Sequence, residues 1–218
     1  MQITWYGHSC FRLRSRKGVV ITDPYGDGIG YDLPRLRADI VTVSHDHPDH
    51  GNVKAIKGKP RIINGPGEYE IKGIFVIGLP TFRDSREGEP DGPNTVYLFD
   101  FDGVTVCHLG DLHSVPTRAQ VEELSDVDVL LIPVGGDTTI GAAKASEVIS
   151  LLEPKIVIPM HYRTKALQGL KLEPVDPFLK EMGTKDLDAQ DTLKLTKGGL
   201  PSETQVVIMN YLGQDGSS

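Results

Sequence analysis

One stretch of the sequence decides how the fold is interpreted: Ile40-Val41-Thr42-Val43-Ser44-His45-Asp46-His47-Pro48-Asp49-His50-Gly51. Its first four residues are apolar or β-branched and predict a buried strand that ends in a polar loop. Three of the chain's 7 histidines fall within six residues of that loop. Imidazole nitrogens and carboxylate oxygens suit Zn²⁺, Mn²⁺ or Fe²⁺, and no cysteine is near enough to offer a thiolate. A polar surface loop with scattered histidines explains this density less well than a metal site does.

Two more candidate ligands come directly after predicted strands. Asp111 follows the strand Val104–Leu109, and His161 follows the strand Lys155–Pro159. In open α/β sheets, ligands bind outside the carboxyl ends of the strands, so three separate strands can deliver His and Asp side chains to one edge. A single aspartate after a strand is commonly a turn former, and the shared placement is what favours a ligand role for Asp111.

The first half of the chain is rich in predicted strands. Short β-branched or aromatic runs alternate there with turn residues, which is typical of sheet structure. We expect these strands at Gln2–Trp5, Cys10–Arg14, Val19–Thr22, Ile40–Val43, Arg61–Ile63, Tyr69–Ile71, Phe75–Leu79, Val96–Asp100 and Val104–Leu109, with an exposed loop at Asp84–Pro93.

The second half alternates between predicted helices and strands. Helical spacing of apolar residues and a capping box indicate helices at Thr117–Leu124, around residues 145–152 and at Pro177–Met182. Strands are expected at Val127–Ile132, Lys155–Pro159, Thr192–Leu195 and Thr204–Met209. A strand-rich half followed by an alternating half indicates sheets with helices packed on their outer faces.

Composition narrows the class of protein. The 218 residues and 23.8 kDa fit one domain over residues 1–212 with a loose tail at 213–218. A net charge of −7 argues against non-specific binding to nucleic acids or acidic membranes. Neither a membrane-spanning apolar run nor a signal peptide is visible. The 2 cysteines do not suggest a disulfide framework, so we expect a cytoplasmic protein, with a homo-oligomer left open.

The histidine-rich stretch also carries a family resemblance. His45-Asp46-His47-Pro48-Asp49-His50 resembles the HxHxDH signature of the metallo-β-lactamase superfamily. Several other segments resemble the branch of metal-dependent hydrolases related to ascorbate-6-phosphate lactonase and, more distantly, N-acyl-phosphatidylethanolamine phospholipase D: Trp5–Phe11, Thr22–Pro24, Pro93–Thr95, His108–Leu112 and Ile158–Tyr162. The resemblance spans residues 1 to about 212 and implies an α+β fold, a four-layer αββα sandwich with a metal site at one edge.

The resemblance further implies the ligands of one or two zinc ions. His45 and His47 would bind the first metal. Asp49, His50 and His161 would bind the second, and Asp111 would bridge the two. A metal ion lowers the pKa of bound water towards about 7, which supplies a nucleophile at neutral pH. Asp49, as a ligand or beside the ligands, is the expected group to orient and deprotonate that water.

Arg83 departs from the family pattern. The family places a further histidine ligand of the first metal in the segment that Pro80–Asp84 resembles, and Arg83 stands where that histidine is expected. Arginine has no lone pair to donate and stays cationic. Three outcomes remain open. One metal suffices and Arg83 attracts an anionic substrate, another side chain such as His113 completes the first site, or activity is weakened or lost.

Three more residues of the resembling segments have two interpretations each. His8 would orient a ligand or contact substrate, or it would be a histidine satisfied by backbone hydrogen bonds. Asp23 would accept the free N–H of a ligand histidine, or it would be a turn aspartate. His108 is three residues before Asp111, and we expect it to be structural.

The sequence therefore predicts a metal-dependent hydrolase acting on a small anionic ester, lactone or phosphodiester, with Arg163 and Lys165 near the rim of the site. The first alternative is a nuclease of the same superfamily, against which the acidic composition argues. The second is a binding protein weakened in catalysis by Arg83. A Gly-x-Ser-x-Gly elbow, a P-loop and a dinucleotide fingerprint are absent from the sequence.

Overall fold

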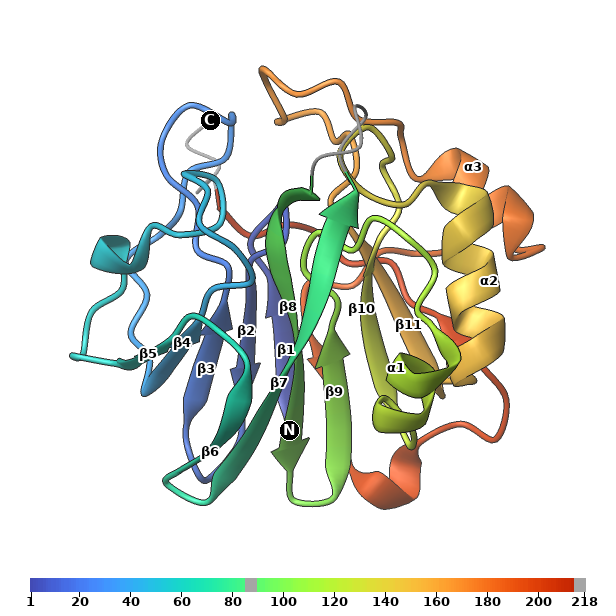
Figure 1. Ribbon diagram of the computed structural model, residues 1–218. Coiled ribbons are helices and arrows are strands. Elements are labelled where there is room, and N and C mark those ends of the chain that lie inside the picture. The colour runs from blue at the N-terminus through green and yellow to red at the C-terminus, as the bar shows by residue number, and fades with distance from the viewer. Residues whose placement is uncertain (85–89, 214–218) are drawn as a thin grey trace.

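Two mixed β-sheets packed face to face form the molecule (Figure 1). The computed structural model describes residues 1–84 and 90–213, and the side chains of residues 82–91 lie outside that description. The first sheet has the strand order β12-β1-β2-β3-β4-β5. Its strands are β1 (Gln2–Trp5), β2 (Phe11–Arg14), β3 (Val19–Thr22), β4 (Ile40–Thr42), β5 (Arg61–Ile63) and β12 (Leu193–Lys194).

The second sheet has the strand order β13-β11-β10-β9-β8-β7-β6. Neighbouring strands from β6 to β9 run antiparallel, whereas β9, β10, β11 and β13 run parallel. The strands are β6 (Gly67–Ile71), β7 (Ile74–Asp84), β8 (Pro90–Phe101), β9 (Val104–His108), β10 (Val129–Pro133), β11 (Ile156–Met160) and β13 (Gln205–Val206).

The helices lie where the apolar spacing predicts them. In α2 (Ala142–Leu152) the residues at helical spacing, from Ala145 to Leu152, are buried. The capping box of Thr117 and Gln120 opens α1 (Arg118–Glu123), and α3 is Asp176–Glu181. All three lie on the side of the second sheet (Figure 1). The sandwich is confirmed. Among the described residues, the outer face of the first sheet is covered by loop residues from Tyr25 to Ala38 and by the 3₁₀ turn Val53–Ala55.

The largest apolar cluster joins the two sheets. It includes Ile3 and Leu13 of the first sheet and Val96 and Tyr97 of the second, all fully buried. The strands β10 and β11 are buried along their whole length, as their unbroken apolar runs predict for parallel strands covered on both faces. Tyr97 also ties the sheets together by a hydrogen bond, because its hydroxyl donates to the carbonyl of Val43 at 3.0 Å.

The hairpin of β7 and β8 differs from the expectation. Both strands run into the segment Asp84–Pro93, which was expected to be an exposed loop, and only residues 85–89 of it lie outside the described part. The expectation is wrong at Asp84 and at residues 90–93, because cross-strand pairing, which continues past Thr81 and Asn94 to Asp84 and Pro90, outweighs the local turn signals there. The closing strands β12 and β13, in contrast, are shorter than expected.

The carboxyl ends of β4, β9 and β11 meet at one edge of the sandwich, the upper edge in Figure 1. These ends carry the loops in which the candidate metal ligands lie. None of the helices in residues 1–84 and 90–213 is long and apolar enough to cross a bilayer.

Candidate metal centre

The loop after β4 turns tightly and buries three of its polar side chains. The backbone N–H groups of His50 and Gly51 both donate to the carbonyl of His47, at 3.0 and 2.8 Å. This turn directs His45, Asp49 and His50 into the protein, where each is at most 8% exposed. The ring of His47 points outward, with 55% of its side chain exposed.

Asp23, directly after β3, holds this loop. One carboxylate oxygen, Oδ1, accepts from the backbone N–H of Ser44 at 2.8 Å. The other, Oδ2, accepts from the Ser44 hydroxyl at 2.6 Å and lies 2.9 Å from Nδ1 of His50. The Ser44 hydroxyl oxygen is in turn 3.0 Å from Nδ1 of His45. We therefore assign a ring proton to Nδ1 of both histidines, so that Nε2 is the atom of each ring that would bind a metal.

Asp111, after β9, is positioned by a buried asparagine. The side-chain oxygen of Asn94 accepts from the backbone N–H of Asp111 at 2.9 Å, and its amide donates to the carbonyl of Leu109 at 3.1 Å. Between them lies Gly110, with φ of +56°. A Cβ at Gly110 would collide with the Asn94 side-chain oxygen and with Cβ of Ser44, so this turn requires glycine.

His161 and His8 are joined through their backbones. The N–H of His161 donates to the carbonyl of His8 at 3.1 Å, and the indole N–H of Trp5 donates to the same carbonyl at 3.0 Å. Both histidines have φ of +51°, and Asp23 has φ of +37°. Such left-handed positions are enriched in His and Asp but still carry strain, which clusters at functional sites.

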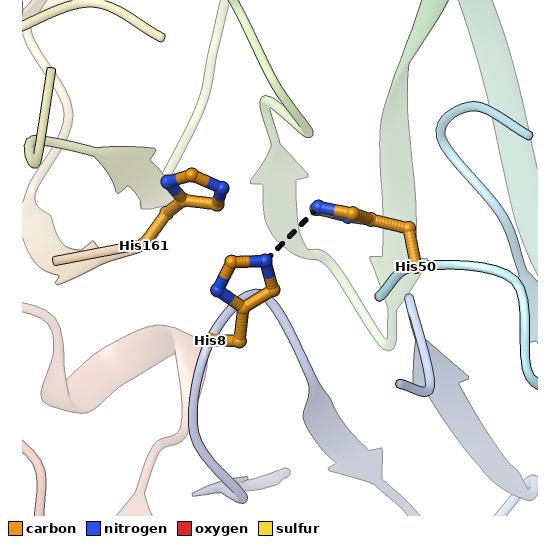
Figure 2. Close-up of side chains that lie close together, drawn as sticks. All are labelled: His8, His50 and His161. Atoms are coloured by element: carbon orange, nitrogen blue, oxygen red, sulfur yellow. Dashed lines mark hydrogen bonds between the residues drawn. The ribbon is translucent and has the colours of Figure 1, made fainter. Parts of the chain in front are cut away.

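These loops bring a compact group of donor atoms together, which we call the inner cluster: His8, Asp49, His50, Asp111 and His161. Figure 2 shows the three histidines pointing toward one another from different elements. Oδ1 of Asp111 lies 3.3 Å from Nε2 of His50 and 3.4 Å from Nε2 of His161. Nε2 of His8 lies 3.2 Å from Nε2 of His50 and 3.3 Å from Oδ2 of Asp49.

These separations fit ligands of one metal ion. Donor atoms about 2.0–2.1 Å from a zinc ion, at tetrahedral or octahedral angles, lie about 2.9–3.4 Å from one another. Oδ1 of Asp111 is buried and has no hydrogen-bond partner among the described residues, although it faces two imidazoles. A buried carboxylate oxygen left in this state is costly unless a cation binds it, so the residues present fit a metal ion.

A second, outer group of donors consists of His45, His47 and Asp49. Nε2 of His45 is 3.7 Å from the second carboxylate oxygen of Asp111, and Nδ1 of His47 contacts Oδ1 of Asp49. The two carboxylates thus lie between the inner and outer groups. All six residues predicted as ligands lie together at this edge.

The charges of the inner cluster are set by burial and by mutual contacts. Burial alone would lower the pKa of His50, but Asp111 and Asp23 outweigh it and raise that pKa to about 9. Burial lowers the pKa of His161 to about 3, so His161 is neutral at pH 7. Burial would raise the pKa of Asp111, yet the histidines around it, His161 first, lower that pKa to about 2.

The other residues singled out in the sequence are placed as follows. The ring of His113 lies on the carbonyl of Thr138, with Nδ1 at 3.0 Å, and His113 is not among the donor groups found in the described residues. Both ring nitrogens of His108 contact backbone, at Ser9 and Gly110, in agreement with a structural role. Arg83 belongs to β7, but its side chain lies outside the described residues.

The sequence matches the family described as the beta-lactamase superfamily domain over residues 2–161. The chain belongs to the metallo-β-lactamase superfamily. A UPF0173 metal-dependent hydrolase of Korarchaeum cryptofilum is 30% identical over 212 residues, which cover 85% of this chain and 93% of that protein. A UPF0173 protein of Pyrococcus abyssi is 29% identical over 200 residues, covering 79% of this chain and 90% of that protein.

A solved structure extends the likeness to three dimensions. The crystal structure of a candidate Zn-dependent hydrolase of this superfamily from Thermotoga maritima superposes with a TM-score of 0.78 and 42% identity, covering 95% of this chain and 97% of that chain. With the buried donor groups, these relatives identify the protein as a metal-dependent hydrolase. The ascorbate-6-phosphate lactonase branch stays a prediction.

Sequence reasoning missed two contributors to this superfamily site. Ser44 links the ring of His45 to Asp23, and Asn94 clamps the backbone on both sides of Gly110. Both residues are adjacent to resembling segments or within them, but their roles depend on partners across the fold. Of the two interpretations of Asp23, the contact with Nδ1 of His50 at 2.9 Å favours acceptance of the free N–H of a candidate ligand histidine.

Proposed function

We propose that this protein hydrolyses a small anionic ester, lactone or phosphodiester, with water activated by one or two zinc ions. The observation that carries the proposal is the buried Oδ1 of Asp111, which has no hydrogen-bond partner among the described residues and faces the imidazoles of His50 and His161. His50, His161, Asp111 and Asp49 would hold the inner ion, and His45 and His47 would contribute to the outer one. A bound zinc ion would lower the pKa of water and polarise an oxygen of the substrate.

Asp49 is the candidate for orienting the water and accepting its proton. Burial by itself would raise the pKa of Asp49, but the hydrogen bond from His8 and the charges of His50 and His8 outweigh it and lower that pKa. The side chain is therefore a carboxylate at neutral pH. One of its oxygens faces the inner cluster and the other faces His47, so it lies where a proton would be released.

An anionic substrate would be attracted by cationic side chains on the loops that carry the ligands. Arg163 and Lys165, exposed on the loop after His161, are the cations we assign to the rim. The expected role of Arg83, attraction of the same anion, stays part of the proposal. Zinc is proposed from the nitrogen and oxygen donors, with Mn²⁺ or Fe²⁺ as the substitutes that such donors also accept.

We infer that the protein works in the cytoplasm. The inference rests on Cys10 and Cys107, which are both free and buried in the structure. Free thiols are typical of a reducing compartment.

The test is chelation followed by addition of Zn²⁺ or Mn²⁺, with bis-p-nitrophenyl phosphate and a panel of carboxylic esters and lactones as substrates. We expect activity to disappear on chelation and to return with metal. Asp49→Asn should lower kcat by about 100- to 10,000-fold, the usual contribution of a general base. His113→Asn, which changes a histidine on the Thr138 carbonyl, is the matched control and should retain activity.

Activity that is indifferent to chelation and to His50→Ala would refute the proposal. Cleavage of single-stranded RNA, with no turnover of small substrates, would identify a nuclease instead. Thermal stabilisation by metal without turnover of any substrate would identify a binding protein.

A further inference from the structure

The side chain of His8 has no partner other than the inner cluster in the described contacts. The backbone carbonyl of His8 accepts from Trp5 and from His161, so the backbone alone accounts for the turn. The ring is 1% exposed or less, and its Nδ1 has no hydrogen-bond partner among the described residues. Its Nε2 points at Nε2 of His50 and at Oδ2 of Asp49.

The spacing at Nε2 is that of a ligand. When Nε2 of His50 binds a metal ion, its lone pair is used, and His8 can no longer form a hydrogen bond with it. Yet Nε2 of His8 lies 3.2 Å from this atom and 3.3 Å from Oδ2 of Asp49. Two ligands of one zinc ion are about 2.9–3.4 Å apart, so both distances match neighbouring positions around a single ion.

The ring of His8 lies beside the rings of the other two histidines of the inner cluster. The ring centres of His8 and His161 are 4.1 Å apart, and those of His8 and His50 are 4.8 Å apart. Ligand atoms of these three histidines all lie within 4.8 Å of one another (Figure 2). A left-handed backbone at His8, with φ of +51°, holds the ring there.

We propose that His8 is a direct ligand of the inner metal ion, which then has three imidazoles and two carboxylates. The ligand set implied by the sequence resemblance for this ion has only two imidazoles, those of His50 and His161. The extra donor makes the inner site complete without His45 and His47, so the inner ion binds first and does not depend on His47. The inference rests on the metal centre of the proposed function but not on its substrate class.

The test counts imidazoles on the first ion bound. Apo protein labelled with ¹⁵N-histidine is given one equivalent of Co²⁺, a paramagnetic substitute for Zn²⁺, and ring N–H signals with hyperfine shifts are counted by NMR. The expected number is three, from His8, His50 and His161. His47→Asn, which removes an outer donor, should still give three, and so should the control His113→Asn.

The variant His8→Asn tests the same ligand by affinity. Asparagine tolerates the left-handed backbone but is too short to reach the position of Nε2. Loss of a residue that merely supports a ligand costs about 10–100-fold in metal affinity, so loss of the ligand itself should cost at least about 100-fold. Zn²⁺ affinity is measured by competition with a chelating dye, and circular dichroism of the apo protein verifies folding.

The outcomes separate this inference from the function. Two shifted signals in the unmodified protein, or unchanged Zn²⁺ affinity in folded His8→Asn, would overturn the ligand role of His8 and leave the hydrolase intact. Absence of Co²⁺ or Zn²⁺ binding altogether would overturn the metal centre itself. The count in the unmodified protein decides the matter even if His8→Asn does not fold.

Discussion

Asp23→Asn removes one charge and no volume from the residue that orients two histidines. In the unmodified protein, Oδ2 of Asp23 accepts a hydrogen bond from the Ser44 hydroxyl at 2.6 Å and lies 2.9 Å from Nδ1 of His50. In the variant an amide NH₂ takes the place of one of the two oxygens. The Ser44 hydroxyl can rotate to accept from it, but Nδ1–H of His50 cannot. With the NH₂ at the Oδ2 position, His50 must lose this bond or move its proton to Nε2, where the metal is expected. With the NH₂ at the Oδ1 position, the backbone N–H of Ser44 loses its acceptor and the loop that carries His45 is released instead.

The magnitude follows from these contacts. A hydrogen bond to a charged group contributes about 1.5–3 kcal/mol, so loss of one, with a weaker one at Ser44, should lower the free energy of unfolding by about 3 kcal/mol. Loss of a residue that supports a metal ligand lowers metal affinity by about 10–100-fold, or about 1.4–2.7 kcal/mol. The backbone does not interfere, because asparagine tolerates the φ of +37° at this position.

The assay is Zn²⁺ competition with a chelating dye, together with urea unfolding of the apo protein. Asp111 and Asp23 together raise the pKa of His50 to about 9, so loss of the Asp23 charge weakens proton competition, and affinities are compared at pH 9 to limit this effect. Asp39→Asn is the matched control, since Asp39 accepts hydrogen bonds from the backbone N–H of Val19 and from Lys72 at the amino end of β4, opposite to the end that carries the metal loop, and should not affect metal binding. Unchanged Zn²⁺ affinity in Asp23→Asn would refute the orienting role.

Three other predictions concern the same edge of the fold. Because His50 has a pKa of about 9 in the apo protein, a metal ion must displace its proton, and Zn²⁺ affinity should rise about tenfold per pH unit between pH 7 and 9. Calorimetry in buffers of different ionisation enthalpy should detect about one proton released at pH 7, and release of none would contradict the assignment of His50 as a ligand. Asn94→Ala should lower the free energy of unfolding by about 2–3 kcal/mol and also reduce kcat, because Asp111 loses the acceptor of its backbone N–H; normal kcat in a destabilised variant would show that Asn94 supports only the fold. Gly110→Ala should be destabilised by at least about 1–3 kcal/mol from strain at φ of +56° and should bind Zn²⁺ weakly. An unfolding temperature equal to that of the unmodified protein would argue against the close approach of Asn94.

Local patterns in the sequence were sufficient for the elements and for the chemical type of the site. The apolar run of β10, the helical spacing from Ala145 to Leu152 and the capping box of Thr117 all correspond to observed structure. These features depend on neighbours a few residues away, which a sequence shows directly. The same holds for the dense histidines after β4, whose donor types indicate a metal without reference to the fold.

Contacts between residues far apart in the chain decided which side chains meet at the site and how far the strands β7 and β8 extend. His8 and His50 are 42 residues apart in the chain, yet their Nε2 atoms lie 3.2 Å from each other. Asn94 reaches Asp111 because β8 and β9 pair in one register, and the same kind of pairing extends β7 and β8 through a segment that looks like a loop. A periodic pattern specifies which face of a strand is buried, but it does not specify which residue of another strand lies opposite. Distances of a few ångströms between donors of one ion depend on that register, and so they appear only in the folded chain.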